Sequence, residues 1–135
     1  MDIDEIKKEL DRLSKPQLEK LLANLDHVSF SFIINMSFLK YGAHPITIHK
    51  EVYHFLKVHN IAPNQDLRIL FPDGSTATGY IYHGTAGWGE FYQIKVKQSY
   101  SETGRGVNQF KKGDRIKVEI LKSGSKKQIQ LSNLK

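Results

Sequence analysis

Hydrophobic residues follow two different periods along this chain of 135 residues. Between residues 3 and 25 they recur every three or four positions, as on the buried side of a helix. Two capping-box patterns, which begin at Asp2 and Ser14, mark two helix starts in this segment. From Val28 onward the hydrophobic positions instead form short alternating runs. The pattern therefore predicts a helical hairpin followed by a β-rich body.

The β-rich body is predicted to contain seven strands and one helix. Phe30, Phe32, Ile34, Met36 and Phe38 share one parity, which predicts a long first strand with a buried face. Many short strands with glycine-rich connections are typical of a barrel or sandwich rather than a parallel sheet. The other predicted strands are 46–48, 67–71, 77–82, 91–97, 115–121 and 128–131, with a helix at 50–58 and an irregular stretch at 99–109.

Residues 81–98 are the most informative stretch. Two β-rich segments flank a predicted loop, residues 83–90, which holds three glycines and the only tryptophan, Trp88. A large aromatic side chain at such a tip has little core to pack into. In the strand that follows, Tyr92, Ile94 and Val96 alternate with Gln93, Lys95 and Lys97. We expect one apolar face and one basic, hydrogen-bonding face, although an ordinary hairpin with a solvated face has the same pattern.

Charge distinguishes the two parts of the chain. The formal net charge is +6 and the isoelectric point is about 9.5. Residues 1–27 hold seven acidic and five basic residues, so the body carries +8. A basic body favours nucleic acid or an acidic surface as partner. The alternative is that the positive charge serves only solubility and that the body binds no anionic partner. The lack of cysteine makes the cytoplasm the expected location, and no apolar run is long enough to predict a membrane partner.

Catalytic patterns are weaker than the binding pattern. Every fifth residue from His44 to His59 is a histidine, a period that fits neither a helix face nor a strand face, so no shared metal is expected. Residues 72–73, Pro-Asp, resemble the start of a PD-(D/E)xK nuclease motif, but neither Glu90 nor Glu119 is followed by x-Lys. A turn explains residues 72–75 better. We predict a non-catalytic protein without a cofactor.

Four segments of the body, taken in order, resemble the B3-type DNA-binding pseudobarrel. This family includes plant transcription-factor B3 domains and the DNA-recognition domains of some bacterial restriction endonucleases. The segments are ITIHKEV (46–52), LRILFPDG (67–74), the pair YIYHG and FYQI (80–84 and 91–94), and FKKGDRIKV (110–118) with QIQL (128–131) as closing strand. Thr47 replaces the family's proline, and the loop lacks the arginines usual in plants.

This resemblance covers residues 28–135 and implies a mainly β (α+β) fold, a seven-stranded B3-like pseudobarrel with short helices. Residues 1–27 then form a separate N-terminal helical hairpin, which packs on the body, on a second copy or on a partner protein. The implied function is recognition of double-stranded DNA in the major groove by two loops, in restriction or transcription. The alternatives are a protein-interaction module of a phage or mobile-element factor, such as an anti-defence protein, and a small Mg²⁺-dependent nuclease.

The resemblance also selects candidate DNA-binding residues. We expect the two loops on one side of the barrel, about 12 Å apart, with His44 and His83 lining one surface. Gln can bond an adenine edge, and Lys or Arg can bind phosphate. The candidates are Lys40, Tyr41, Gly42 and His44 in the first loop, His83, Gly84, Thr85 and Trp88 in the second, Gln93, Lys95 and Lys97 on the following strand, and Arg105.

Overall fold

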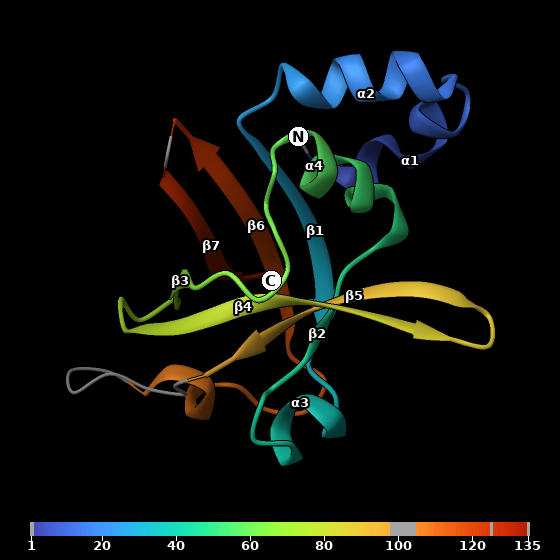
Figure 1. Ribbon diagram of the computed structural model, residues 1–135. Helices are drawn as coiled ribbons and strands as arrows, with labels where there is room; N and C mark the ends of the chain where they lie inside the picture. The colour runs from blue at the N-terminus through green and yellow to red at the C-terminus, as the bar shows by residue number, and fades with distance from the viewer. Residues whose placement is uncertain (1, 98–104, 125, 135) are drawn as a thin grey trace.

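Seven strands form one mixed sheet that curls into a nearly closed barrel (Figure 1). The computed structural model describes residues 2–97, 105–124 and 126–134. Within them the strand order is β1-β6-β7-β3-β4-β5-β2, with β3 parallel to β7 and the other neighbours antiparallel. The strands are β1 (His27–Ile33), β2 (Ile46–Thr47), β3 (Leu67–Leu70), β4 (Thr76–Ala86), β5 (Gly89–Val96), β6 (Arg115–Ser123) and β7 (Lys126–Asn133). The predicted mainly β class is confirmed.

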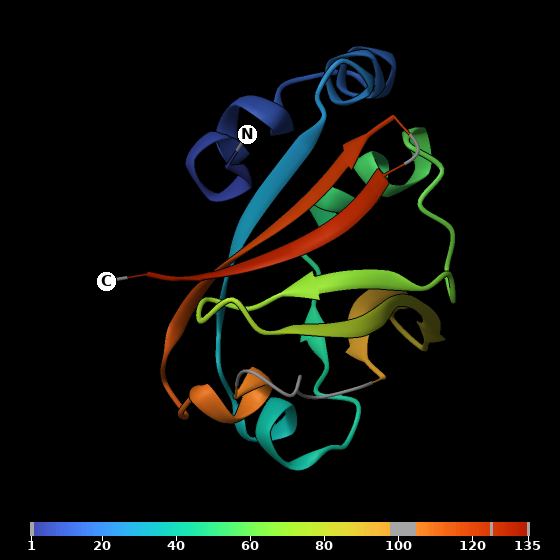
Figure 2. The same ribbon diagram turned by 90° about the vertical axis from the view of Figure 1, so that its left-hand side faces the viewer.

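Short helices cover both ends of the barrel (Figure 2). The first two helices lie near α4 at one end, and α3 and η2 lie at the other. They are α1 (Ile3–Asp11), α2 (Lys15–Ala23), α3 (Met36–Lys40), η1 (Lys50–Val52), α4 (Tyr53–Val58) and η2 (Gly106–Gln109). The helix predicted at 50–58 is thus present as a 3₁₀ turn that continues into an α-helix, and Val52, Phe55 and Leu56 are buried as expected.

The predicted long first strand is wrong in its second half. Strand β1 ends at Ile33, and the chain turns at Asn35 into α3. The side-chain oxygen of Asn35 accepts a hydrogen bond from the Phe38 amide at 2.9 Å, which caps the new helix. Phe38 is still fully buried, because the helical turn directs its ring against Phe32 and Phe110. A local cap therefore overrides the alternating pattern without changing which phenylalanine is buried.

The loop predicted at residues 83–90 is largely strand. Register pairs on β4 and β5 continue through Gly84–Phe91 to Ala86–Gly89, so that only Gly87 and Trp88 form the turn. Gly89 has a φ of +132°, a backbone conformation that other residues rarely adopt. The glycines therefore belong to a long hairpin that extends beyond the barrel core.

The N-terminal helices pack on their own barrel. The predicted capping box at Ser14 and Gln17 is present at the start of α2. Leu22 of α2 is fully buried, and His59 at the end of α4 donates from Nε2 to the Leu22 carbonyl at 2.9 Å. Ile3 and Leu10 of α1 belong to the same hydrophobic core as the strands. The helices thus add apolar area to a core that they share with the barrel.

Leu22→Ala is expected to lower the free energy of unfolding by about 2–5 kcal/mol, because it leaves a cavity between α2 and the barrel. The adjacent Leu21, which is exposed, provides the matched control. Leu21→Ala should change stability by less than about 0.5 kcal/mol. Urea unfolding of both variants, followed by circular dichroism, measures the difference. Equal effects of the two substitutions would contradict a shared core.

Candidate functional site

The β4–β5 hairpin has two chemically different faces. Ile81 and Ile94 pair across the strands and are fully buried, which turns every second side chain of the hairpin inward. The alternate side chains point away from the core. We call these the outer face; its residues are Thr78, Tyr80 and Tyr82 on β4 with Phe91, Gln93, Lys95 and Lys97 on and just after β5. The predicted division of β5 into an apolar and a basic side is therefore confirmed.

Aromatic rings follow one another along the outer face toward the turn. The ring centroids of Tyr82 and Phe91 are 5.9 Å apart, and those of Phe91 and Trp88 are 5.7 Å apart. We call these three residues the aromatic row. The Lys95 ammonium lies 3.8 Å from the Tyr82 ring centroid, in cation–π geometry. Trp88 is 75% exposed, so the tip of the hairpin presents a large apolar ring to solvent, as its position in the sequence predicted.

Gly84 creates the space in which the aromatic row lies. It pairs directly with Phe91 across the two strands. A Cβ atom at Gly84 would lie 2.4 Å from Phe91 Cζ and 2.9 Å from Tyr82 Cε1, both far inside contact distance. The absence of a side chain therefore lets the Phe91 ring lie across β4. Gly84 was a candidate DNA-binding residue of the predicted loop. The structure shows instead that its lack of a side chain leaves room for the Phe91 ring.

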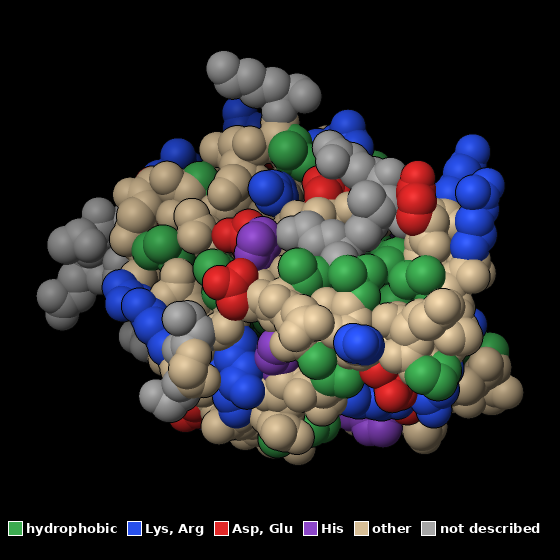
Figure 3. Space-filling view, turned by 90° about the horizontal axis from the view of Figure 1, so that it is seen from above, with side chains coloured by type: hydrophobic (Ala, Val, Ile, Leu, Met, Phe, Trp, Pro, Cys, Tyr) green, Lys and Arg blue, Asp and Glu red, His purple; other side chains and the backbone are tan. Residues whose placement is uncertain are grey.

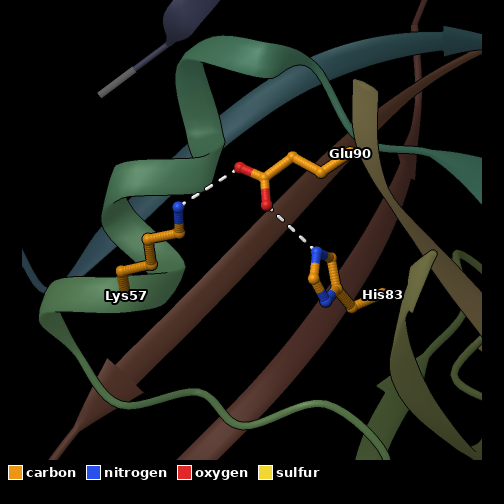
Figure 4. A network of polar contacts seen from close by, with 3 residues as sticks. All are labelled: Lys57, His83 and Glu90. Carbon is orange, nitrogen blue, oxygen red and sulfur yellow. Dashed lines mark hydrogen bonds and ion pairs between the residues drawn. The ribbon is translucent and has the colours of Figure 1, made fainter. Parts of the chain in front are cut away.

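The inner face beyond the core carries a polar network rather than a DNA-reading histidine (Figure 4). His83 Nε2 donates to Glu90 Oε2 at 3.0 Å, and Lys57 of α4 donates to Glu90 Oε1 at 3.3 Å. The His83 ring also stacks on Tyr92, with centroids 4.6 Å apart. The hydrogen bond from His83, followed by that from Lys57, holds the pKa of Glu90 below its usual range. Glu90 is therefore paired within the protein, while its side chain stays partly exposed.

The two predicted loops lie toward opposite ends of β5. The Ala43 carbonyl accepts from the Val96 amide at 2.7 Å, whereas the turn at Trp88 lies beyond Gly89, seven residues away along the strand. At about 3.3 Å per residue, this is roughly 23 Å of strand. His44 donates from Nδ1 to the Phe38 carbonyl at 2.8 Å, and His83 points to the inner face. The structure therefore does not bring these two histidines onto one surface.

The remaining first-loop candidates lie at the far end from the turn. Lys40 is the last residue of α3, and both it and Tyr41 are exposed. Gly42 has open space around its Cα, so nothing in the structure demands glycine there. Thr85, a candidate of the second loop, is exposed near the hairpin tip. These residues remain available to a partner, but the geometry gives them no shared binding surface with the outer face.

Lys97 and Arg105 are engaged within the protein. Lys97 Nζ lies 2.6 Å from Asp66 Oδ1. Arg105 donates from its guanidinium to the Asn108 carbonyl at 3.2 Å and from its backbone amide to Asp73 Oδ2 at 2.9 Å. Residues 99–104 of the irregular stretch predicted at 99–109 lie outside the described residues. Arg105 thus closes a structural turn, and Lys97 is partly neutralised.

Asp73 forms a turn, as its Pro-Asp-Gly context predicted. Its carboxylate accepts hydrogen bonds from the Arg105 backbone amide and from Ser75, and these bonds hold its pKa well below the usual range. Across the described part of the chain, no group of three His, Cys, Asp or Glu side chains is placed to hold a metal ion. Among these described residues, no such group surrounds Asp73.

The sequence did not single out Thr78, Tyr80, Tyr82 and Phe91 of the outer face, or the neighbouring Arg68. Arg68 on β3 pairs with Thr78 and is exposed, which extends the basic surface by one strand. Phe91 has the same parity as Gln93 and Lys95, a signal that could have placed it on this face. The roles of Tyr80 and Tyr82 depend on their register with β5, which the sequence alone does not specify.

The helical end of the molecule has a different surface. Viewed along the barrel from this end, Lys and Arg side chains are interspersed with Asp, Glu and hydrophobic side chains (Figure 3). By contrast, β4 and β5 contain a single acidic residue, Glu90, which lies on the inner face. The outer face is therefore the better candidate for an anionic partner.

Comparison of the chain with protein-family models and with curated proteins finds no match to either. None of the helices in the described parts of the chain is both long and apolar enough to cross a membrane. The assignment of a function consequently rests on the geometry of the hairpin.

Glu90→Gln tests the inner network through its pH dependence. Because the folded-state pKa of Glu90 is below the ordinary 4.5, its stabilisation is present above about pH 4.5 and is lost as the pH falls through the folded value. The wild type should therefore have the higher melting temperature at pH 7, and the difference should shrink toward pH 3. Glu9→Gln, at an exposed position on α1, is the control. A Glu90→Gln difference that does not depend on pH would contradict the network.

Proposed function

We propose that the protein is a non-catalytic DNA-binding module that docks on double-stranded DNA with the outer face of the β4–β5 hairpin. One observation carries the proposal: strand parity places Lys95, which has no acidic partner among the interactions described for it, on the outer face and directs Glu90 away from it. An ammonium group that is free of acidic partners in this way is complementary to phosphate. Arg68 on the neighbouring strand adds a further positive charge.

The shape of the hairpin suits the major groove. That groove is about 12 Å wide and admits a two-stranded β-ribbon. Gln93 lies between Tyr82 on β4 and Thr47 on β2, so a side chain able to bond an adenine edge lies at the middle of the face. Lys95 is placed to contact phosphate or guanine beside it. The exposed Trp88 lies in the turn at the tip of this hairpin.

The resemblance to the B3-type family supports the same function at the level of the fold. A seven-stranded barrel with helices is what that resemblance implies, and the restriction or transcription setting and the cytoplasmic location come with it as parts of the proposal. The contacts differ from the expected two-loop grip. We assign direct contact to the hairpin, and to Lys40 and Tyr41 at most a contact with flanking backbone, because they lie toward the far end of β5.

A protein-interaction module is the second candidate function. It is favoured by exposed apolar side chains outside the hairpin, at Ile33 (59% exposed) and Met36 (40% exposed), around the start of α3. Apolar contacts of this kind bind proteins with little dependence on salt. Binding to DNA would instead weaken steeply with salt, because phosphate neutralisation releases counterions.

Lys95→Ala should lower the slope of log affinity against log salt by about one unit, if Lys95 neutralises one phosphate. Fluorescence polarisation of a labelled random duplex, measured over a series of salt concentrations, provides the slope. Lys97→Ala should have a smaller effect, because Asp66 already pairs with Lys97.

Lys20→Ala is the matched control, because this lysine is exposed on α2 at the helical end. Its slope should equal that of the wild type. If Lys95→Ala leaves the slope unchanged, the outer face is not the DNA-binding surface. Binding that hardly responds to salt would instead favour the protein-interaction function.

A further inference from the structure

The aromatic row is not needed to read paired DNA. In a duplex the bases are stacked on one another, and only their edges are accessible in the grooves. The Lys and Gln side chains of the outer face suffice for such edge and phosphate contacts. The row nevertheless places three rings in succession on the outer face, and a side chain at Gly84 would collide with two of them, Phe91 and Tyr82. Exposed rings of this kind are suited to stack on a partner whose own ring faces are exposed.

Ring geometry indicates how such a partner would bind. Adjacent rings in the row are tilted by 48° and 37°, so neither pair is stacked face to face. Lys95 already lies over the Tyr82 ring, which leaves Phe91 and Trp88 as the accessible platform. Their centroids are 5.7 Å apart, more than the roughly 3.4 Å rise between stacked bases of one strand. Two bases could therefore each stack on one ring only if the strand is unstacked.

Positive charge lies where the backbone of such a strand would run. The Lys95 ammonium is next to Tyr82, the ring that adjoins Phe91 in the row. Aromatic rings beside a basic track are the common arrangement of proteins that bind single-stranded nucleic acid. Glu90, the one acidic residue of the two strands, is held on the inner face by Lys57 and His83 and does not oppose a phosphate here.

We propose that Phe91 and Trp88 form a stacking platform for two unpaired bases of a DNA strand. This inference rests on the proposed DNA-binding function and adds a substrate preference to it. The protein should bind a duplex that continues into a single-stranded overhang more tightly than a blunt duplex. The paired part lies along Gln93 and Lys95, and the unpaired bases lie on the platform near the turn.

A cleft on the other side of the turn provides an internal comparison. It has a volume of about 290 Å³ and is lined by Lys50, Tyr53, Trp88, Gly89 and Glu90. Trp88 borders both the cleft and the aromatic row, whereas Phe91 belongs to the row and Tyr53 to the cleft. Substitutions at Phe91 and Tyr53 therefore distinguish bases on the platform from a base inserted into the cleft.

Trp88 provides a direct readout because it is the only tryptophan. The wild-type protein is titrated with a blunt duplex, with the same duplex carrying a five-thymine overhang, and with oligothymidine alone. Tryptophan emission reports stacking, and polarisation of labelled DNA reports affinity. We expect the overhang to quench Trp88 emission and to bind more tightly than the blunt duplex. The blunt duplex should bind with little quenching.

Phe91→Leu keeps an apolar side chain but removes the ring. It should weaken binding of the overhang substrate roughly 5- to 100-fold, the loss typical of one stacked base, and should remove most of the preference for the overhang substrate over the blunt duplex. Tyr53→Leu is the matched control and should leave both affinities unchanged. Melting temperatures of both variants verify that they are folded.

The outcomes separate the two proposals. Equal affinity for blunt and overhang duplexes, with no effect of Phe91→Leu, overturns the platform and leaves the DNA-binding function intact. A loss confined to Tyr53→Leu also overturns it, because the base would then lie in the cleft. Binding of oligothymidine with quenching but no binding of the blunt duplex would overturn the double-stranded assignment and retain the platform. No binding of any of the three DNAs would overturn both.

Discussion

The burial of Ile81 opposite Ile94 is the constraint on which the rest of the hairpin depends. Both side chains are fully excluded from solvent, and they fix the parity of the two strands beyond the barrel. A slip of one residue would turn Lys95 toward the core and expose the isoleucines. Because an unpaired buried ammonium is very costly, only one parity of the two strands is compatible with folding. The basic outer face is therefore a consequence of core packing.

Because of this parity, the side chains of the two faces take part in different interactions. On the inner face Glu90 joins the hairpin to α4 through Lys57 and pairs with His83, so these charges are used within the protein. On the outer face Lys95 contacts only an aromatic ring among the interactions described for it, and it remains available to a phosphate. Gly84 also shapes the outer face, because its lack of a side chain leaves room for the Phe91 ring beside the exposed turn.

Sequence alone predicted the features that depend on local periodicity. The alternation in β5, the α2 capping box and the exposure of Trp88 are all properties of neighbouring residues. Features that depend on distant partners were not predictable in this way. The Asn35 cap ended β1 earlier than alternation suggested. Glu90 acquired its partner from α4, 33 residues away in the chain. The aromatic row required the register that places Phe91 opposite Gly84.

Contact between DNA and the outer-face rings is the most direct test of this account. Tyr82 and Phe91 lie on the outer face, whereas Tyr53 and Tyr92 contact each other on the inner side. Intermolecular nuclear Overhauser effects between DNA protons and assigned ring protons, measured in the complex by NMR, distinguish the two sets. The account predicts effects to Tyr82 and Phe91 and none to Tyr53 or Tyr92. Effects confined to Tyr53 and Tyr92 would contradict it.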